Sequence, residues 1–152
     1  SKIDIDAAQQ AHFLRRSLEL EIVRMLALEH EPGLIEELNR TIALQQHFAS
    51  TGDFAAFMAA DNDFHWQLYA AAAKRELWML VRSRSGHIDR LRRLHLPTPG
   101  KAQDIVLHHQ MIVQAIESRQ PAEAQESLRK HLSGTLGYLG EIRARHPDYL
   151  RD

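Results

Sequence analysis

The 152-residue sequence contains no cysteine, which excludes disulfide bonds and thiolate metal sites. It also has only seven glycines and five prolines, which are clustered at a few breaks. Long regular segments can therefore form between these breaks. Apolar residues make up 44% of the chain, which is typical of a folded domain with a core and excludes a disordered tail.

Neither sign of charge dominates, because 19 basic and 20 acidic side chains give a formal net charge of −1. No global field therefore draws the chain onto nucleic acid or anionic lipid. No apolar run approaches the roughly 20 residues that a membrane-spanning helix requires, and the first residues do not resemble a signal peptide. We expect a cytoplasmic protein without a membrane partner.

Every long segment carries the period of an amphipathic helix, and none alternates in the manner of a strand. The sequence therefore predicts an all-α bundle that forms one domain over residues 1–152. Asp6 and Asp53 are suitable N-caps for the first and third helices. The predicted helices span residues 6–30, 34–50, 54–73, 76–94, 102–118 and 121–145.

The segment DNDFHWQLYA, residues 61–70, carries an acid and an imidazole where a helix should be apolar. Asp61 and His65 share one helix face with Phe57, Phe64 and Leu68, so both are predicted to point inward. Burying a carboxylate costs several kcal/mol or more unless another group pairs with it. This helix therefore needs a polar partner from elsewhere in the chain.

Two other predicted helices each supply one inward imidazole, His109 and His131. One carboxylate and three imidazoles that meet in a core suit Zn²⁺, Ni²⁺, Co²⁺, Mn²⁺ or Fe²⁺. The simpler alternative is that each histidine is a satisfied core residue and that Asp61 accepts a hydrogen bond from one of them. The spacing of the four residues leaves both alternatives open.

Several arginines allow a functional or a purely structural interpretation. Arg84 falls on the inner stripe of the predicted helix 76–94, whereas Arg15 and Glu19 are four residues apart and are predicted to pair on the flank of the first helix. His108, about 100° from His109 around the helix, is expected near the surface. The basic run from residue 82 to residue 93 is interpreted as a solvated helix face.

Four separated segments resemble, in order, the motifs of the FCD domain, the C-terminal ligand-sensing domain of FadR-type regulators in the GntR family. The segment DNDFHWQLYAAA is similar to the D-x-x-F-H signature of that family. FLRRSLELEIVRMLA is similar to the R-x-x-L-E first helix, HHQMIVQAI to the E-H-x-x-I-x-x-A-I helix and AEAQESLRKHL to the closing A-x-x-x-M-x-x-H-L. The sequence departs from the family pattern at Lys74, His108 and Gln120.

The resemblance implies an antiparallel helical bundle of about six to seven helices that holds a divalent metal, with Zn²⁺ as first choice and Ni²⁺, Mn²⁺, Co²⁺ or Fe²⁺ as alternatives. The implied ligands are Asp61, His65, His109 and His131. A small carboxylic or sugar acid is expected in the cavity beside the metal, and an arginine fork suits such a ligand. Arg15 is an effector contact by similarity, and Arg84 is one from its position on the stripe alone.

Two functions follow from these expectations. The preferred one is a sensor that forms a homodimer through the first and fourth helices and reads DNA only through a winged helix-turn-helix, which such regulators carry upstream and which these residues do not contain. The alternative is a metal-dependent hydrolase or lyase that uses an open coordination position. We favour the sensor and expect no enzyme, because no further inward acid is predicted to act as a general base.

Overall fold

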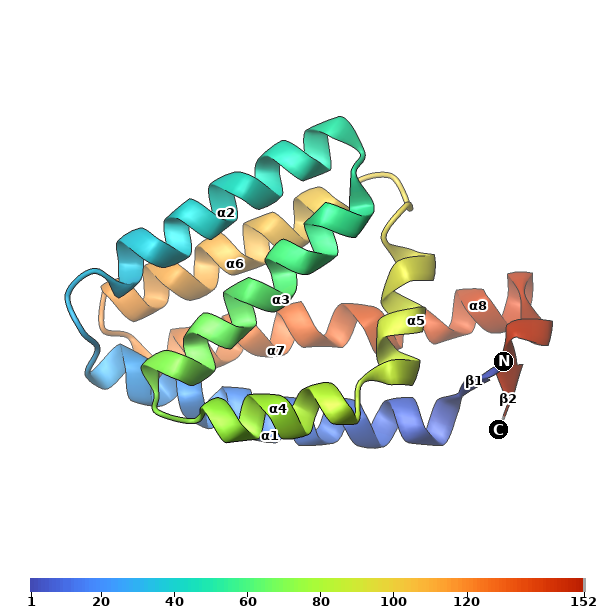
Figure 1. The fold of residues 1–152 in the computed structure, drawn as a ribbon, viewed down its shortest axis with the longest axis horizontal. Helices are drawn as coiled ribbons and strands as arrows, with labels where there is room; N and C mark the ends of the chain where they lie inside the picture. Colours follow the sequence, from blue (N-terminus) through green and yellow to red (C-terminus); the bar gives the residue numbers. More distant parts are fainter. Residues whose placement is uncertain (152) are drawn as a thin grey trace.

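The computed structural model describes residues 1–151, which form an all-α bundle and so confirm the predicted fold class (Figure 1). Each long helix begins or ends at a residue suited to that position; for example, Asp53 caps the third helix by accepting a hydrogen bond from the backbone of Ala56. The helices are α1 (Ile5–Leu28), α2 (Leu34–Thr51), α3 (Phe54–Ala71), α4 (Arg75–Ser83), α5 (Gly86–His95), α6 (Lys101–Glu117), α7 (Pro121–Gly137) and α8 (Leu139–Arg145).

The long helices pack in neighbouring pairs around one main core (Figure 1). Helix α1 lies along α7, α7 lies along α6, and α2 packs against both α3 and α6. Helix α5 crosses the end of this bundle and contacts α1 and α7. The middle of α3 therefore lies against α1 and α2, and Phe64 of α3 stacks on His109 of α6, which brings residues far apart in the sequence to one place.

Two predicted helices are each divided in the structure. The predicted helix 76–94 becomes α4 and α5, because Ser85 donates its hydroxyl to the carbonyl of Val81 at 2.5 Å and Gly86 starts a new helix. Such a side-chain bond competes with the helical ladder. The predicted helix 121–145 is likewise divided at Tyr138 into α7 and α8. The first helix begins earlier than predicted, because Asp4 rather than Asp6 is its N-cap.

The buried stripe of α1 contains charged residues, contrary to the prediction. Arg15 and Glu19 are both buried, in line with Ile22 and Leu26 further along the helix. The spacing of these four positions is that of one helix face. The expected surface pair of Arg15 and Glu19 is therefore wrong, and the pair lies in the interior.

The two ends of the described chain are joined by a short parallel pair of strands, although no strand was predicted. Strand β1 (Ile3–Asp4) pairs with β2 (Leu150–Arg151), which follows the short 3-10 helix Pro147–Tyr149. A second, smaller core lies beside this pair, where Ile3 and Leu150 pack with residues of α1, α5 and α8. The pair anchors the start of α1 against α5.

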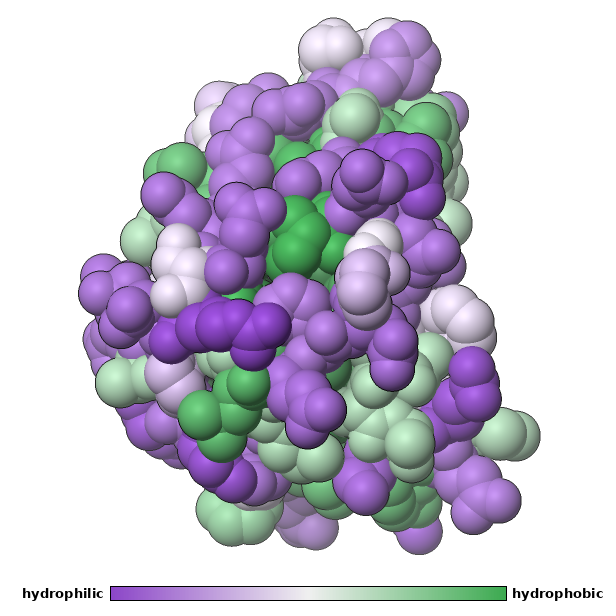
Figure 2. Space-filling view, turned by 90° about the vertical axis from the view of Figure 1, so that its left-hand side faces the viewer, coloured by the Kyte–Doolittle hydropathy of each residue, from purple (hydrophilic) through white to green (hydrophobic). Residues whose placement is uncertain are grey.

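The face of the molecule at one end of the bundle is mainly polar. At the end of the bundle seen in Figure 2, hydrophilic residues predominate and hydrophobic residues form separate patches. Among the described helices, none combines the length and the apolar character that crossing a membrane requires.

Candidate metal centre

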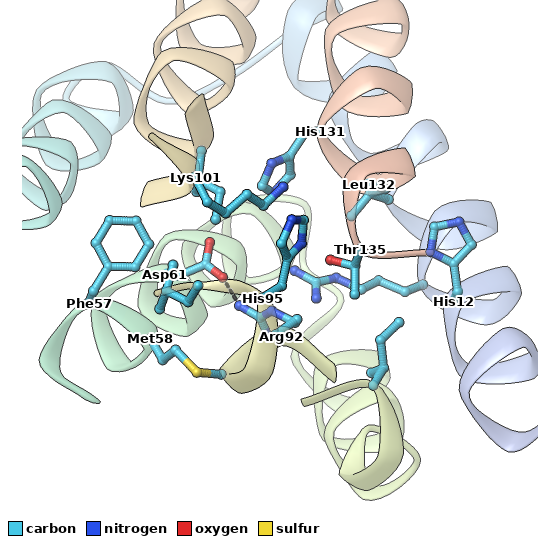
Figure 3. A pocket seen from close by; sticks show the side chains of 14 residues that line it. His12, Phe57, Met58, Asp61, Arg92, His95, Lys101, His131, Leu132 and Thr135 are labelled. Atoms are coloured by element: carbon cyan, nitrogen blue, oxygen red, sulfur yellow. Dashed lines mark ion pairs between the residues drawn. The ribbon is translucent and has the colours of Figure 1, made fainter. Parts of the chain in front are cut away.

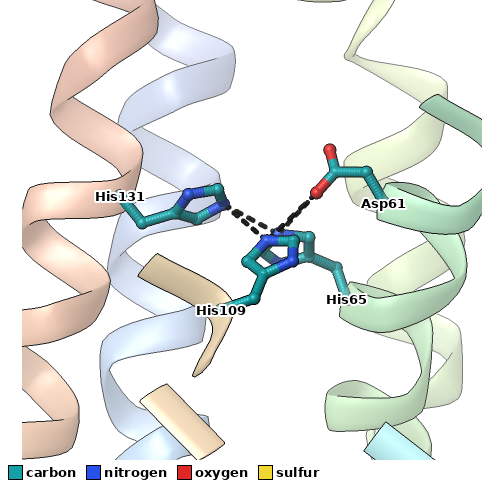
Figure 4. Close-up of side chains that lie close together, drawn as sticks. All are labelled: Asp61, His65, His109 and His131. Carbon is teal, nitrogen blue, oxygen red and sulfur yellow. Dashed lines mark hydrogen bonds and ion pairs between the residues drawn. The ribbon is translucent and has the colours of Figure 1, made fainter. Parts of the chain in front are cut away.

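Asp61, His65, His109 and His131 meet in the interior, as the sequence predicted (Figure 4). All four are buried, and one ligand atom from each lies within 4.8 Å of the others. The Nε2 atom of His131 lies 3.1 Å from Nε2 of His65 and 3.1 Å from Nε2 of His109. Oδ1 of Asp61 lies 3.1 Å from Nε2 of His109 and 3.6 Å from Nε2 of His65. Helices α3, α6 and α7 thus each contribute to one cluster.

The outer nitrogen atoms of two of these rings are held by hydrogen bonds, which assigns their tautomers. Nδ1 of His65 lies 2.5 Å from Oε1 of Glu19 and donates to it. Nδ1 of His109 donates to the side-chain oxygen of Gln45 at 2.8 Å. A neutral imidazole carries one proton, so the Nε2 atom of both rings presents a lone pair to the centre of the cluster.

Too few protons are available for each of these lone pairs to accept a hydrogen bond within the cluster. Oδ1 of Asp61 has no hydrogen-bond partner, and His131 can donate a proton from Nε2 to only one of its two neighbours. A cation at the centre would satisfy all four atoms. Tetrahedral ligands at about 2.0–2.2 Å from a Zn²⁺ ion lie roughly 3.3–3.6 Å apart, which is close to the separations of 3.1 Å and 3.6 Å given above. The residues therefore fit a divalent metal, with the nitrogen and oxygen donors that Zn²⁺ prefers.

Burial keeps these rings in the form that binds metal. It holds the pKa of His109 and His131 well below the usual range, and it also lowers the pKa of His65, although Glu19 opposes that shift. All three rings are therefore neutral near pH 7. A neutral imidazole is the form that coordinates a metal.

Glu19 is a buried carboxylate that the sequence reading missed. It accepts hydrogen bonds from His65, from Nε of Arg15 at 2.7 Å and from the hydroxyl of Tyr69 at 3.0 Å. Although burial raises its pKa, Arg15 and His65 outweigh this effect and lower the pKa of Glu19 to about 2. The expectation that no further inward acid exists is therefore wrong. However, the hydrogen bonds that Glu19 accepts make it a support for His65 rather than a free base.

A cavity of about 30 Å³ lies next to Asp61, between α1, α3, α5, α6 and α7 (Figure 3). This volume suits ordered water or one ion rather than an organic acid. Arg92 forms an ion pair with Asp61 across the cavity, and Arg15 lines it. The prediction that Arg92 belongs to a solvated helix face is therefore wrong. The remaining lining includes His12, His95, Lys101 and Thr135.

Arg84 does not lie where the sequence reading put it. It is exposed at the end of α4, where the predicted helix is interrupted, and it does not line the cavity. His108 is half-buried, and its ring lies 5.9 Å from that of His131, so it is closer to the cluster than expected. Lys74 and Gln120 are the N-cap residues of α4 and α7, and neither is next to a residue of the cluster in the sequence.

Comparisons with known proteins agree with the resemblance seen in the sequence. Residues 10–134 match the family model described as the FCD domain. The chain is 28% identical over 148 residues to a protein of Streptomyces ambofaciens described as an uncharacterized HTH-type transcriptional regulator in an unstable DNA locus. The alignment covers 97% of this chain but only 62% of that protein, so the chain spans less than two thirds of the relative's length.

Proposed function

The chain belongs to the FCD domain family, and on this basis we propose that it is the ligand-sensing domain of a GntR-type transcriptional regulator of the FadR subfamily. It binds a small carboxylic or sugar acid beside a divalent metal, most suitably Zn²⁺. Asp61, His65, His109 and His131 hold the metal. The observation that carries this proposal is the convergence of one possible ligand atom from each of the four residues, all of which a single divalent cation would satisfy.

A bound metal would supply a Lewis acid that accepts a carboxylate oxygen of the effector. Arg15 supports this role, because its Nη2 atom is buried and has no hydrogen-bond partner among the described residues, although Nε is bound to Glu19. An effector carboxylate in the cavity would give Nη2 a charge-assisted hydrogen bond. Arg92 replaces Arg84 as the second arginine of the site, because it reaches Asp61 from α5.

The small volume of the cavity implies a conformational step. An acid needs more space than about 30 Å³, so Arg92 and its neighbours must move when the acid enters. Arg92 lies on α5, and α5 contacts β1 and α1 at the start of the chain. Effector binding would therefore shift the population of α5 positions, provided that the acid binds the two states with different affinities.

The regulator context comes from the relative, whose printed description is that of an HTH-type transcriptional regulator. We propose that this domain acts in the cytoplasm on a DNA-binding module outside these residues. We also propose a homodimer through α1 and α4, which lie side by side (Figure 1) and expose apolar side chains. Phe13 and Met79 are each 69% exposed. A Phe13→Glu variant that sediments like the wild-type protein would contradict this interface.

Two measurements test the proposed function. Metal analysis of the purified protein should find one divalent ion per chain, and His109→Ala should lose it. Calorimetry with a panel of small carboxylic and sugar acids should then give binding to metal-loaded protein and none to chelated protein. Equal binding in both states would remove the metal from the proposal. Turnover of an acid by the loaded protein would instead favour the metal-dependent hydrolase or lyase.

A further inference from the structure

A second group of polar atoms faces the same cavity and has no role in the metal cluster. It comprises the ammonium group of Lys101 on α6, Nδ1 of His95 on α5 and the hydroxyl of Thr135 on α7. All three side chains point into the cavity in Figure 3. They therefore converge from three different helices on one space.

These groups have few partners of their own. Nδ1 of His95 is buried without a hydrogen-bond partner, and its ring is fixed by stacking on Tyr138 at 3.9 Å. No described carboxylate forms an ion pair with Lys101; Asp104, on the same helix, only attracts it at longer range. Lys101 is half-buried and lowers the pKa of His95 further than burial alone, to about 4. An unpaired, half-buried ammonium group is costly unless an anion joins it.

The backbone of α7 leaves room for this ammonium group. A Cβ atom on Gly134 would lie only 2.6 Å from Nζ of Lys101. Any larger residue would therefore push the end of the lysine side chain away from α7. The ammonium group of Lys101 therefore lies directly against the backbone of α7 at Gly134.

The charges of the cavity favour a ligand with two negative groups. Arg15 is matched by Glu19. Arg92 keeps Asp89 as a partner at 3.2 Å when Asp61 is shared with a metal, although the partly exposed Arg82 also pairs with Asp89, at 2.6 Å. A divalent ion with one carboxylate ligand leaves one positive charge in excess, and Lys101 adds a second. A monocarboxylate would neutralise only one of the two.

Resting on the proposed function, we propose that Lys101, with His95 and Thr135, forms a second anion subsite, and that the effector is therefore a dicarboxylic acid or a dicarboxylic sugar acid. One carboxylate lies beside the metal and Arg15, and the other lies against Lys101. The subsite selects dianions over monoanions of the same length.

The test is calorimetry on Zn²⁺-loaded protein with matched acids: propionate and malonate, butyrate and succinate, gluconate and glucarate. We expect at least one dicarboxylate to bind about tenfold or more tightly than its partner, because a charge-assisted hydrogen bond in a partly buried site has about this strength. The Zn²⁺ content is measured after each titration, since a dicarboxylate that removed the ion would produce heat of its own.

Lys101→Met should abolish the preference for dicarboxylates and leave monocarboxylate binding within about twofold. Lys130→Met is the matched control, because Lys130 is exposed on α7 and its loss changes the net charge equally. It should leave both affinities unchanged. Gly134→Ala should weaken dicarboxylate binding selectively, because the new methyl group displaces the ammonium group.

The outcomes separate this inference from the proposed function. Equal affinities within every pair, or an equal loss of both acids in Lys101→Met, would overturn the dianion subsite and leave the sensor intact. Failure of all six acids to bind the Zn²⁺-loaded protein would overturn the proposed sensor itself, and the subsite with it. A preference for dicarboxylates that Lys101→Met removes and Lys130→Met retains would support both.

Discussion

The two sides of the histidine cluster are built differently. On the side of α1, Glu19 is fully buried and accepts hydrogen bonds from Arg15, His65 and Tyr69. On the side of α5 and α6, Lys101 and His95 are only half-buried; Nδ1 of His95 has no hydrogen-bond partner, and Lys101 has no ion-pair partner, among the described residues. The side of α1 fixes the ring of His65 in one orientation, whereas the side of α5 and α6 leaves a positive charge available to bind an anion. A sensor needs both, because a rigid metal site is of use only where a ligand can reach it.

The largest expected effect comes from removing a residue of the cluster itself. His109→Ala should lower the affinity for Zn²⁺ by at least about a hundredfold, because it removes a proposed ligand rather than a supporting group. Calorimetry and metal analysis measure this loss. The matched control is His108→Ala, since this neighbouring ring lies outside the cluster. Equal losses in the two variants would show that the four residues do not act as ligands.

A change on the rigid side should affect folding and metal binding together. Glu19→Gln leaves Arg15 buried without its counter-charge, which should cost about 3 kcal/mol of unfolding free energy. It should also weaken Zn²⁺ binding by about tenfold or more, because His65 loses its charged acceptor. Urea unfolding and calorimetry measure the two effects. Glu21→Gln is the control, because Glu21 pairs with Arg24 at the surface of the same helix and should change neither.

A change on the open side should have opposite effects on the metal and on the acid. Arg92→Met removes a cation that competes for Asp61, so the affinity for Zn²⁺ should rise by up to about tenfold. The affinity for a small acid should fall by a similar factor, because the cavity loses a positive group. Calorimetry of both ligands measures the changes. Arg93→Met, at an exposed position of α5, should leave both affinities as they are; a fall in both for Arg92→Met would contradict this role.

The smallest expected effect is a pH dependence that separates the two sides. In chelated protein, His95 has a pKa of about 4, below its ordinary value of 6.5, so the unfolded chain takes up its proton first as the pH falls. The free energy of unfolding should therefore decrease from about pH 6.5 towards about pH 4. The pKa values of His109 and His131 are also lowered, so these rings add to the same decrease. Glu19, with a pKa of about 2, loses its contribution only below its ordinary value of 4.5.

His95→Gln tests this separation, because it should remove part of the loss between about pH 6.5 and about pH 4. The expected difference is below about 2 kcal/mol, since a half-exposed group is screened by solvent. Urea unfolding at several pH values in the presence of a chelator measures it. His47, which is exposed on α2, provides the control variant His47→Gln. An unfolding free energy that rose as the pH fell through this range would contradict the assignment.

The sequence was sufficient to predict that the four residues of the cluster meet in the core. A carboxylate and three imidazoles at apolar positions of three helices must find partners in the core, and the structure brings them together. Metal binding by these residues stays a prediction. Their supports were harder to find, because the stripe of α1 was read from its apolar residues alone. The burial of Arg15 and Glu19 depends on Tyr69 and His65, which approach from another helix.

Arg92 and Arg84 were misread for one reason. If residues 76–94 formed one continuous helix, Arg92, eight positions after Arg84, would point about 80° away from it, at the edge of the predicted stripe. The hydrogen bond of Ser85 to Val81 interrupts that helix and gives α5 a new direction. A single serine before a glycine is a weak signal in a sequence. The cavity, which depends on the position of α5, could therefore not be predicted.

The pairing of β1 with β2 makes the described chain a nearly closed ring. Ile3 lies in register with Leu150, and Asp4 with Arg151, so the beginning and the end of this segment are neighbours (Figure 1). A short peptide could link them without disturbing a helix, and new ends could be opened in the exposed turn at residues 97–100. Circular permutants of this kind would let a fluorescent reporter be inserted where α5 meets the cavity.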